Sequence, residues 1–264
     1  MYFHNLDPVL IDFGFITIRW YSLAYVVGIT IGWWLGKKIL AHISRNIDLN
    51  FSLKEFDDLI AYIIVSLIIG GRLGYIIFYN LEYYIANPLD IIKIWEGGMS
   101  FHGALIGIIL GTYYFSKVRG ISAFVLLDVI ACVSPIGIFL GRIANFINGE
   151  LVGKVTDVSW AVIFPTIDTF PRHPSQLYEA VLEGALLFLI MNIIIFKKDY
   201  KIGRCSFLFL ICYGFLRIVS EFFREPDAHL GYFFNILSMG TILSFFMILA
   251  GFFYFIIFSK KNEN

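Results

Sequence analysis

Long apolar stretches separated by short polar segments dominate this chain. A helix needs about 20 mainly apolar residues to cross the hydrocarbon core of a bilayer, and stretches of this kind recur along the sequence. The pattern predicts seven membrane-spanning helices, at residues 15–40, 56–79, 101–116, 121–146, 176–196, 205–223 and 234–258. The third stretch is short, which leaves open a start in the interface or in a re-entrant segment.

Composition supports this interpretation. Of the 264 residues, 59% are hydrophobic and only 15% are charged, and the mean hydropathy is +0.79. Because charged residues make up about a quarter of an ordinary globular chain, we expect an all-α polytopic membrane protein that forms a single integral membrane domain over residues 1–264. The net charge of zero gives no indication of a nucleic-acid partner. Residues 1–14 contain no Lys or Arg and no cleavage motif, so no signal peptide is predicted.

The three cysteines, Cys132, Cys205 and Cys212, all lie in apolar stretches. They show no pairing of the kind that metal ligands show. We interpret them as small, buried and inert side chains, and the sequence implies no metal or other cofactor.

Basic residues are distributed unevenly between the two sides of the predicted helices. Lys and Arg near helix ends mark the cytoplasmic side, and alternation of the helices places 12 of the 20 basic residues on one side. These are Lys37, Lys38, Arg45, Lys54, Lys117, Arg119, Lys197, Lys198, Lys201, Arg204, Lys260 and Lys261. The N-terminus is therefore predicted to face outward and the C-terminus to face the cytoplasm.

The outward side holds mainly arginines, several of them within or at the ends of predicted helices. Arginine at such depth is costly and usually marks a paired or functional site. Because a planar guanidinium grips phosphate well, an anionic lipid headgroup is the ligand that this placement favours. The longest linker on the same side, residues 148–175, contains VTDVSWAVIFP, whose β-branched and aromatic residues predict a small extended arm.

The stretch GRIANFINGE at 141–150 ends an apolar run with a polar cluster. Arg142 and Asn145 are three residues apart and therefore neighbours on one helix face, Asn148 and Glu150 line the exit, and Gly153 permits a close turn. The alternative is a helix cap formed by asparagine, with Glu150 paired to Arg142. A membrane helix can end on Gly or Asn alone, so the cluster favours a functional site.

A second cluster lies in CYGFLRIVSEFFREPD. Tyr213, Arg217, Glu221 and Arg224 fall on one helical stripe, and Pro226 is expected to end the helix. The glutamate can neutralise part of the arginine charge and hold the side chains in place. The alternative is an ion-pair ladder that only fixes helix packing, at a desolvation cost that brings little stability.

His102 begins the third predicted helix, after Ser100 as a plausible N-cap. Histidine titrates near neutrality without help, so His102 is a candidate general base, although a single interfacial histidine is more often structural. Tyr21 and Tyr25 share a face near the outer end of the first helix, where interfacial tyrosines are common. The stretches around Arg72 and in RHPSQLYEA, including Glu179, are interpreted as scaffold.

Several catalytic signatures are missing: the sequence has no GxSxG, no HExxH, no intramembrane aspartate pair and no Gly-rich phosphate loop. An enzyme with this composition would have to draw its nucleophile from a substrate.

GRIANFINGELVG at 141–153 resembles the signature of the prolipoprotein diacylglyceryl transferase family. The stretches RWYSLAYVVG, GGRLGYIIFYN, FHGALIG, RHPSQLYE and RIVSEFFREPD resemble the same family in the same order, so the resemblance covers nearly the whole chain. In one departure, Ala104 replaces the second glycine of the usual His-Gly-Gly motif. The additional methyl group can tighten the pocket, but His102 stays in place and activity is expected to persist.

The resemblance implies a seven-helix enzyme of the bacterial cell membrane, with its active site toward the outer face. It implies transfer of the diacylglyceryl group of phosphatidylglycerol to the lipobox cysteine thiol of a preprolipoprotein signal peptide, which forms a thioether and releases glycerol phosphate. Carried over by motif, the catalytic residues are Tyr25, His102, Arg142, Glu150 and Arg217. Phosphatidylglycerol would contact Arg142, Asn145, Tyr213, Arg217, Glu221 and Arg224, while Asn148 and Gly153 would be positioning residues.

In the mechanism that this carry-over suggests, Arg142 and Arg217 clamp the phosphate, and His102 or a water that it holds takes the thiol proton. Glu150 and Glu221 set the arginine geometry, while Asn145 and Tyr25 position headgroup or peptide. Two other classes remain open. A transporter for an anionic solute should show internal repeats and polar groups near the midplane, and a lipid-binding structural or insertion factor would bind phosphatidylglycerol without consuming it. An intramembrane protease is disfavoured because no catalytic dyad is evident.

Overall fold

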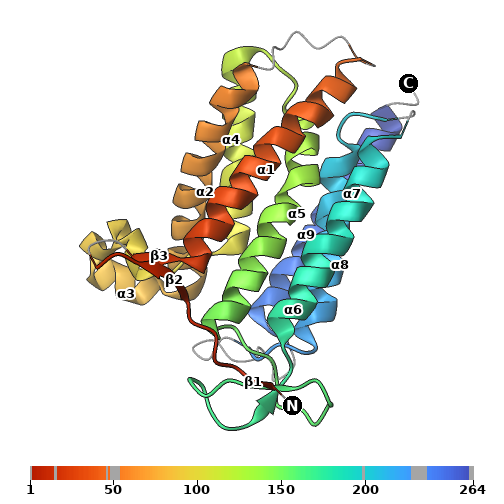
Figure 1. Cartoon of the computed structure of the whole chain (residues 1–264). Coiled ribbons are helices and arrows are strands. Elements are labelled where there is room, and N and C mark those ends of the chain that lie inside the picture. The colour runs from red at the N-terminus through yellow and green to blue at the C-terminus, as the bar shows by residue number, and fades with distance from the viewer. Residues whose placement is uncertain are drawn as a thin grey trace. The chain divides into compact units, whose positions relative to one another are not determined.

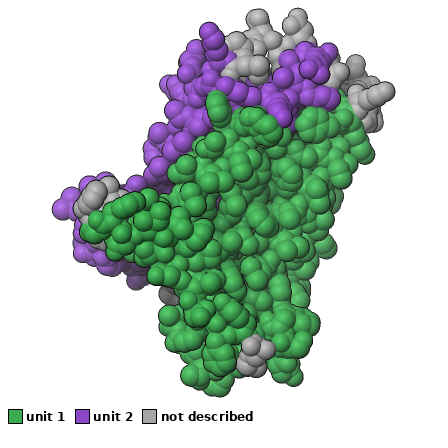
Figure 2. Space-filling model, in the orientation of Figure 1, with its two compact units in different colours: residues 1–36, 128–264 green, residues 37–127 purple. Residues whose placement is uncertain are grey.

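The computed structural model of the chain describes residues 2–14, 17–45, 47, 54–197, 200–226 and 237–261. These residues are mostly helical (Figure 1). The chain divides into two compact units, one formed by residues 1–36 and 128–264 and the other by residues 37–127 (Figure 2). Within each unit, helices pack against one another.

Five helices in the described part of the chain are long and apolar enough to cross a membrane. They are Trp20–Ile43 (α1), Glu55–Tyr79 (α2), Ala123–Asn148 (α5), the segment Ser175–Ile195 and Met239–Ile257, which belongs to α9 (Met239–Lys261). The chain is therefore a multi-pass membrane protein. Helices also form at the two remaining predicted positions, as α4 (Phe101–Arg119) and α8 (Arg204–Glu221).

The first predicted helix begins later than its apolar pattern suggests. Residues 15 and 16 lie outside the described residues, and Thr17–Arg19 form strand β3, which pairs antiparallel with β2 (Val9–Asp12). Two β-branched residues, Thr17 and Ile18, favour the extended conformation here, so α1 starts only at Trp20. The predicted start of the last helix, residue 234, also lies outside the described residues.

The 37–127 unit is built on close packing of α2 against α4, which lie side by side in Figure 1. A Cβ atom added at Gly70 would lie 2.5 Å from the carbonyl oxygen of Gly103, and one at Gly74 would lie 2.5 Å from Gly103 Cα. Small residues at such a crossing let the two backbones approach closely, as is common between membrane helices. The glycines of FHGALIG therefore have a packing role.

Arg72 on α2 organises the connection that follows, which contains α3 (Leu81–Ala86) and the short helices η1 (Pro88–Ile92) and η2 (Ile94–Glu96). Its guanidinium donates hydrogen bonds to five carbonyl oxygens, those of Asp90, Ile91, Lys93, Gly97 and Gly98, at 2.5–3.2 Å. A buried arginine with its donors directed at backbone is a structural clamp, in agreement with the scaffold interpretation of this stretch.

In the other unit, α5 packs with a continuous helical segment made of α6 (Ser175–Glu179), a π-helical turn η3 (Ala180–Leu186) and α7 (Leu187–Ile195). A Cβ atom at Gly184 would lie 2.6 Å from Phe139 Cβ, so this glycine lets α5 and η3 approach closely. Helices α8 and α9 pack against each other, and Gly214 and Gly251 lie at close contacts between them.

Asp128, a buried residue of α5 that the sequence analysis did not single out, fixes the start of α8. Its carboxylate accepts hydrogen bonds from Tyr200 Oη at 2.6 Å, from the amides of Gly203 and Ser206 at 2.6 and 2.7 Å, and from Ser206 Oγ at 2.6 Å. The first amides of a helix have no intrahelical acceptor. A carboxylate from another helix satisfies them here and holds α8 to α5.

The predicted arm at 148–175 contains two short strands, β4 (Val162–Ile163) and β5 (Pro171–Arg172), which pair antiparallel. The N-terminal strand β1 (Tyr2–Phe3) adds to β4 in parallel, with Tyr2 opposite Val162. Val152, Val162 and Phe164 form a small buried cluster beneath these strands, with Phe146 of α5 packed against it. Within VTDVSWAVIFP, Val162 and Ile163 are extended as strand β4, and Val155 lies in a bridge opposite Arg172.

Candidate functional site

The end of α5 brings Glu150 back over the helix that it follows. Gly149 adopts a left-handed conformation with φ +66°, its amide donates to Phe146 O at 3.0 Å, and the Glu150 amide donates to Asn145 O at 3.2 Å. This pair of bonds is the Schellman helix ending, which favours glycine at the left-handed position. Asn148, Gly149 and Glu150 therefore form the C-terminal ending of α5, and this ending also positions the Glu150 carboxylate.

Amide side chains surround Glu150. Asn145 Nδ2 donates to Glu150 Oε1 at 2.7 Å and Asn148 Nδ2 donates to the same oxygen at 3.4 Å, while Gln176 Nε2 donates to the Glu150 backbone oxygen at 2.7 Å. The pairing of Glu150 with Arg142, which the capping alternative required, is replaced by these contacts. The contacts of Glu150 among the described residues therefore do not support the prediction that it sets the arginine geometry. Glu150 instead accepts a hydrogen bond from Asn145.

Arg142 is directed at two glutamates of the neighbouring helical segment. Its Nε lies 2.9 Å from Glu179 Oε2 and its Nη2 lies 3.5 Å from Glu183 Oε2. Both carboxylates are fully buried, whereas the Arg142 side chain is 15% exposed. The donors on Nη1 of Arg142 have no partner among the described residues, which leaves part of this guanidinium available to a ligand.

Arg217 of α8 converges on the same glutamates. Its Nη1 lies 2.8 Å from Glu179 Oε2 and 3.3 Å from Glu183 Oε1, and its Nη2 pairs with Glu221 one turn further along α8. Arg142 and Arg217 therefore share a single carboxylate oxygen, Oε2 of Glu179. Two arginines from different helices are held side by side by one residue of a third.

Arg224 joins this group from outside α8. The helix ends at Glu221, before the predicted stop at Pro226, so the expected helical stripe does not extend to Arg224. Arg224 instead lies in a bridge opposite Gly153, and its Nη1 lies 3.5 Å from both oxygens of Glu179. The turn at residues 222–223 ends the helix and returns the chain to the arm.

Gly153 is where the arm meets the end of α8. A Cβ atom at this position would lie 2.7 Å from Phe223 O and closer still to His173 O. The flanking backbone pairs on both sides, since Gly153 N donates to His173 O at 3.1 Å and Lys154 N donates to Phe223 O at 2.9 Å. Only glycine fits between these two backbone segments, which gives a physical basis for its predicted positioning role.

The cluster balances its charge internally. Three arginines, Arg142, Arg217 and Arg224, face three glutamates, Glu179, Glu183 and Glu221. Serines complete the shell: Ser220 Oγ donates to Glu183 Oε1 at 2.7 Å and Ser238 Oγ donates to Glu221 Oε2 at 2.8 Å. Buried charges persist only when they are paired and hydrogen-bonded, and this group meets both conditions.

Glu179 and Glu183 were missed as functional residues by the sequence analysis, which treated the stretch containing Glu179 as scaffold. A signal for Glu183 exists, because an acidic residue within the apolar segment 176–196 marks a candidate functional site. The π-helical turn at 180–186 is a second signal, since such turns occur frequently at functional sites, but it is visible only in the structure.

The predicted tyrosines take different positions. Tyr213 is buried one turn before Arg217, stacks on Phe209 at 5.7 Å and lies within electrostatic range of Glu183. Tyr25 on α1 is about half exposed, contacts the Tyr21 ring at 5.3 Å, and lies within electrostatic range of Glu150 and Arg142. Both therefore belong to the neighbourhood of the arginine cluster.

His102 lies in the 37–127 unit, half-buried in the first turn of α4. Ser100 caps this helix as predicted, because its side chain accepts a hydrogen bond from the Gly103 amide at 3.2 Å. The His102 ring contacts Phe101 edge-on at 5.5 Å. A Cβ atom at Gly71 would lie 3.5 Å from the methyl group of Ala104, so the departure from the His-Gly-Gly motif is accommodated at the packed face of α4.

Charged groups on the arm are organised as well. The Arg172 guanidinium lies 2.5 Å from Asp168 Oδ2 and holds the pKa of that carboxyl below its usual range. Burial, together with the nearby Lys154, lowers the pKa of His173. No group of three or more His, Cys, Asp or Glu side chains suited to a metal ion occurs in the described ranges.

These features define a class: a multi-pass helical membrane protein with a buried arginine–glutamate cluster that leaves guanidinium donors available to an anion. The model of the prolipoprotein diacylglyceryl transferase family matches residues 8–257. The chain belongs to this family.

Curated relatives agree with the family assignment. The chain is 47% identical over 253 residues to the phosphatidylglycerol–prolipoprotein diacylglyceryl transferase of Rickettsia felis, covering 95% of this chain and 96% of the relative. It is 49% identical over 249 residues to the protein of that name from Rickettsia typhi, covering 94% and 95%. The relative from Methylocella silvestris is 48% identical over 248 residues, covering 93% and 91%.

Proposed function

We propose that this protein is a phosphatidylglycerol–prolipoprotein diacylglyceryl transferase. Its substrates are phosphatidylglycerol and a prolipoprotein that carries a lipobox cysteine. The cysteine sulfur forms a bond to the terminal glyceryl carbon of the diacylglyceryl group, and the bond between that carbon and the phosphate oxygen breaks. The products are a thioether and glycerol phosphate. The observation that carries the proposal is the pair of arginines that share Glu179, in a chain whose residues 8–257 match this family.

The phosphate is held by Arg142 and Arg217. Arg142 is the more accessible of the two and keeps the Nη1 donors for a ligand. Negative charge grows on the phosphate as the carbon–oxygen bond breaks, and fixed guanidinium donors stabilise such charge most when they need no reorganisation. Glu179, Glu183 and Glu221 provide that fixation. The headgroup site is completed by Asn145, which Glu150 holds, and by Arg224, Tyr213 and Tyr25. Asn148 and Gly153 keep the local backbone in place.

His102, or a water that it holds, takes the proton from the substrate thiol. Thiolate is the effective nucleophile, and the chain offers no nucleophile of its own in a recognised catalytic motif. The proton then passes to the departing glycerol phosphate.

The protein is located in the bacterial cell membrane with seven spanning helices, including α4 and α8. Its N-terminus and the arm at 148–175 face outward and its C-terminus faces the cytoplasm, in accord with the positive-inside distribution of Lys and Arg. Three charged residues on α8, Arg204, Arg217 and Glu221, explain why it is less apolar than the other helices.

A reconstituted transfer reaction tests the function. Purified protein is incubated with phosphatidylglycerol and a lipobox peptide that contains one cysteine, and mass spectrometry follows the diacylglyceryl adduct while a separate assay follows glycerol phosphate. The expected result is equal amounts of both products, and none with a peptide in which serine replaces the cysteine. Folded, lipid-bound protein that forms no adduct would instead indicate a lipid-binding factor or a transporter.

A further inference from the structure

We propose that His4 is a positioning residue for the transferase site, acting through the end of α5. The inference rests on the proposed function for its catalytic consequence, but the contact itself can be tested without it. His4 precedes residues 8–257, which match the family model.

The contact joins the N-terminal segment to the helix end that carries the site. His4 Nε2 lies 2.7 Å from the carbonyl oxygen of Phe146. A carbonyl oxygen can only accept, so the imidazole donates and the proton lies on Nε2. The same carbonyl accepts the Gly149 amide at 3.0 Å within the Schellman ending, and His4 therefore satisfies its second lone pair.

The imidazole of His4 is buried between aromatic rings. His4 is 8% exposed, and its ring packs edge-on against Phe146 at 5.5 Å and tilted against Phe164 at 5.1 Å. A Cβ atom at Gly149 would lie 3.4 Å from His4 Cε1. The ring thus packs against the left-handed turn that returns Glu150 to Asn145.

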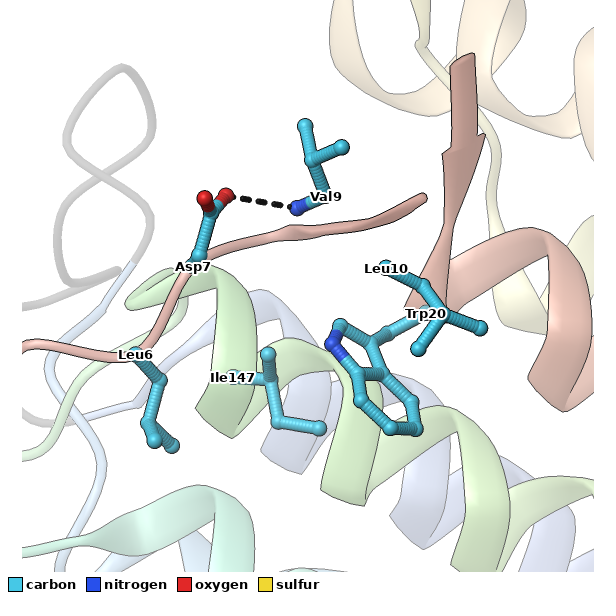
Figure 3. A pocket seen from close by; sticks show the side chains of 6 residues that line it. All are labelled: Leu6, Asp7, Val9, Leu10, Trp20 and Ile147. Carbon is cyan, nitrogen blue, oxygen red and sulfur yellow. Dashed lines mark hydrogen bonds between the residues drawn. The ribbon is translucent and has the colours of Figure 1, made fainter. Parts of the chain in front are cut away.

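Backbone pairing keeps His4 in register. The His4 amide donates to Ile163 O at 2.9 Å, and β1 continues the pairing with β4. Beyond His4, the segment passes over the last turn of α5, where Leu6, Asp7, Leu10 and Trp20 enclose a pocket of about 270 Å³ with Ile147 (Figure 3). The N-terminal segment is therefore bonded to the last turn of α5 at His4, and it lines a pocket with Ile147 of the same turn.

The last turns of α5 carry three residues of the proposed site, namely Arg142, Asn145 and, just after the helix, Glu150. Asn145 and Glu150 are linked by the Schellman bond and by their side chains, and Arg142 lies one turn earlier on the same helix. The last turns of a helix fray most readily because their carbonyls lack partners. A buried donor on Phe146 O restrains this turn and with it the position of Asn145 and Glu150.

Two variants distinguish the contribution of the His4 hydrogen-bond donor from that of the His4 ring. His4→Phe keeps an aromatic ring of similar size and removes the donor, whereas His4→Gln keeps an N–H donor and removes the ring. Tyr2→Phe is the matched control, since it removes only an exposed hydrogen bond from Tyr2 Oη to Asn5 in the same segment. Each is examined as the full chain in detergent with phosphatidylglycerol, by hydrogen exchange of residues 143–151 and by the transfer reaction.

We expect His4→Phe to increase exchange at residues 143–151 and to lower kcat about five-fold, the change that corresponds to one hydrogen bond of about 1 kcal/mol. His4→Gln should restore both, and Tyr2→Phe should match the natural protein. Unchanged exchange in His4→Phe, or equal losses in His4→Phe and His4→Gln, would overturn the proposal. If His4→Phe does not fold, His4→Gln decides alone: native exchange supports the donor role, and raised exchange refutes it. A natural protein that transfers nothing contradicts the proposed function, while the exchange result still tests the contact.

Discussion

Replacing Glu179 by glutamine removes one negative charge from the centre of the arginine cluster while preserving side-chain shape. In the natural protein, Glu179 Oε2 lies 2.9 Å from Arg142 Nε and 2.8 Å from Arg217 Nη1, and both carboxylate oxygens lie 3.5 Å from Arg224 Nη1. The amide can present its oxygen to the first two arginines. Its NH2 group then faces the donors of Arg224, and the cluster keeps one uncompensated positive charge.

The magnitude follows from burial. Glu179 is fully buried, and breaking a buried ion pair by removing one partner costs about 3–5 kcal/mol, because the remaining charge stays desolvated. For a chain of this size, 1 kcal/mol corresponds to about 2–4 °C. We therefore expect Glu179→Gln to lower the melting temperature by about 10 °C.

The assay is thermal unfolding in detergent, with and without phosphatidylglycerol, together with the transfer reaction. The added lipid should stabilise Glu179→Gln more than the natural protein, because its phosphate supplies the missing negative charge. The transfer rate should fall about 10- to 100-fold, since Arg142 and Arg217 lose their common anchor. Asp58→Asn is the control: Asp58 pairs with Arg119 where both side chains are exposed, and such pairs contribute about 0–1 kcal/mol. A Glu179→Gln protein that is as stable as Asp58→Asn would refute the reasoning.

Four further predictions concern single residues. Arg217→Lys should lower transfer at least about 100-fold, because an ammonium cannot reproduce the guanidinium fork, and the reconstituted reaction measures this. His102→Gln should lower the rate and remove the acidic limb of the pH–rate profile, because a protonated imidazole cannot take the thiol proton; a near-normal rate with an unchanged profile would assign the base elsewhere. Gly153→Ala should destabilise the protein by about 1–3 kcal/mol in thermal melts, because its Cβ meets two backbone carbonyls. The pKa of His173 is lowered in the folded state. The contribution of His173 to the stability of the arm should therefore be complete above about pH 6.5 and decline as the pH falls below that value. Hydrogen exchange of residues 151–173 should show this pH dependence in the natural protein and not in His173→Gln.

Local features of the fold were predictable from the sequence because they depend on neighbouring residues. The apolar runs locate the helices to within a few residues, and Ser100 is an N-cap that a short-range pattern reveals. The placement of Arg142 and Asn145 on one helix face likewise follows from their spacing. The first helix was predicted too early, because an apolar pattern does not distinguish the strand at Thr17–Arg19 from a helical turn.

Long-range partners were not predictable in the same way. Glu179 and Glu183 receive their role from arginines on two other helices and from Arg224 beyond the end of α8, at sequence separations of 34–45 residues, and no local pattern contains those pairs. His4 is a stronger example, since its acceptor lies 142 residues away. The prediction that the helical stripe extends to Arg224 was wrong for a local reason: α8 stops at Glu221, and the turn after it determines where Arg224 lies.

The central claim is that the arginine cluster handles the phosphate of phosphatidylglycerol during transfer to a thiol. The most direct measurement compares the natural protein with Arg142→Ala in the reconstituted reaction, following the peptide adduct and glycerol phosphate together, with folding checked by thermal melts. The account predicts equal formation of both products by the natural protein and neither by folded Arg142→Ala. Full transfer by Arg142→Ala would contradict it.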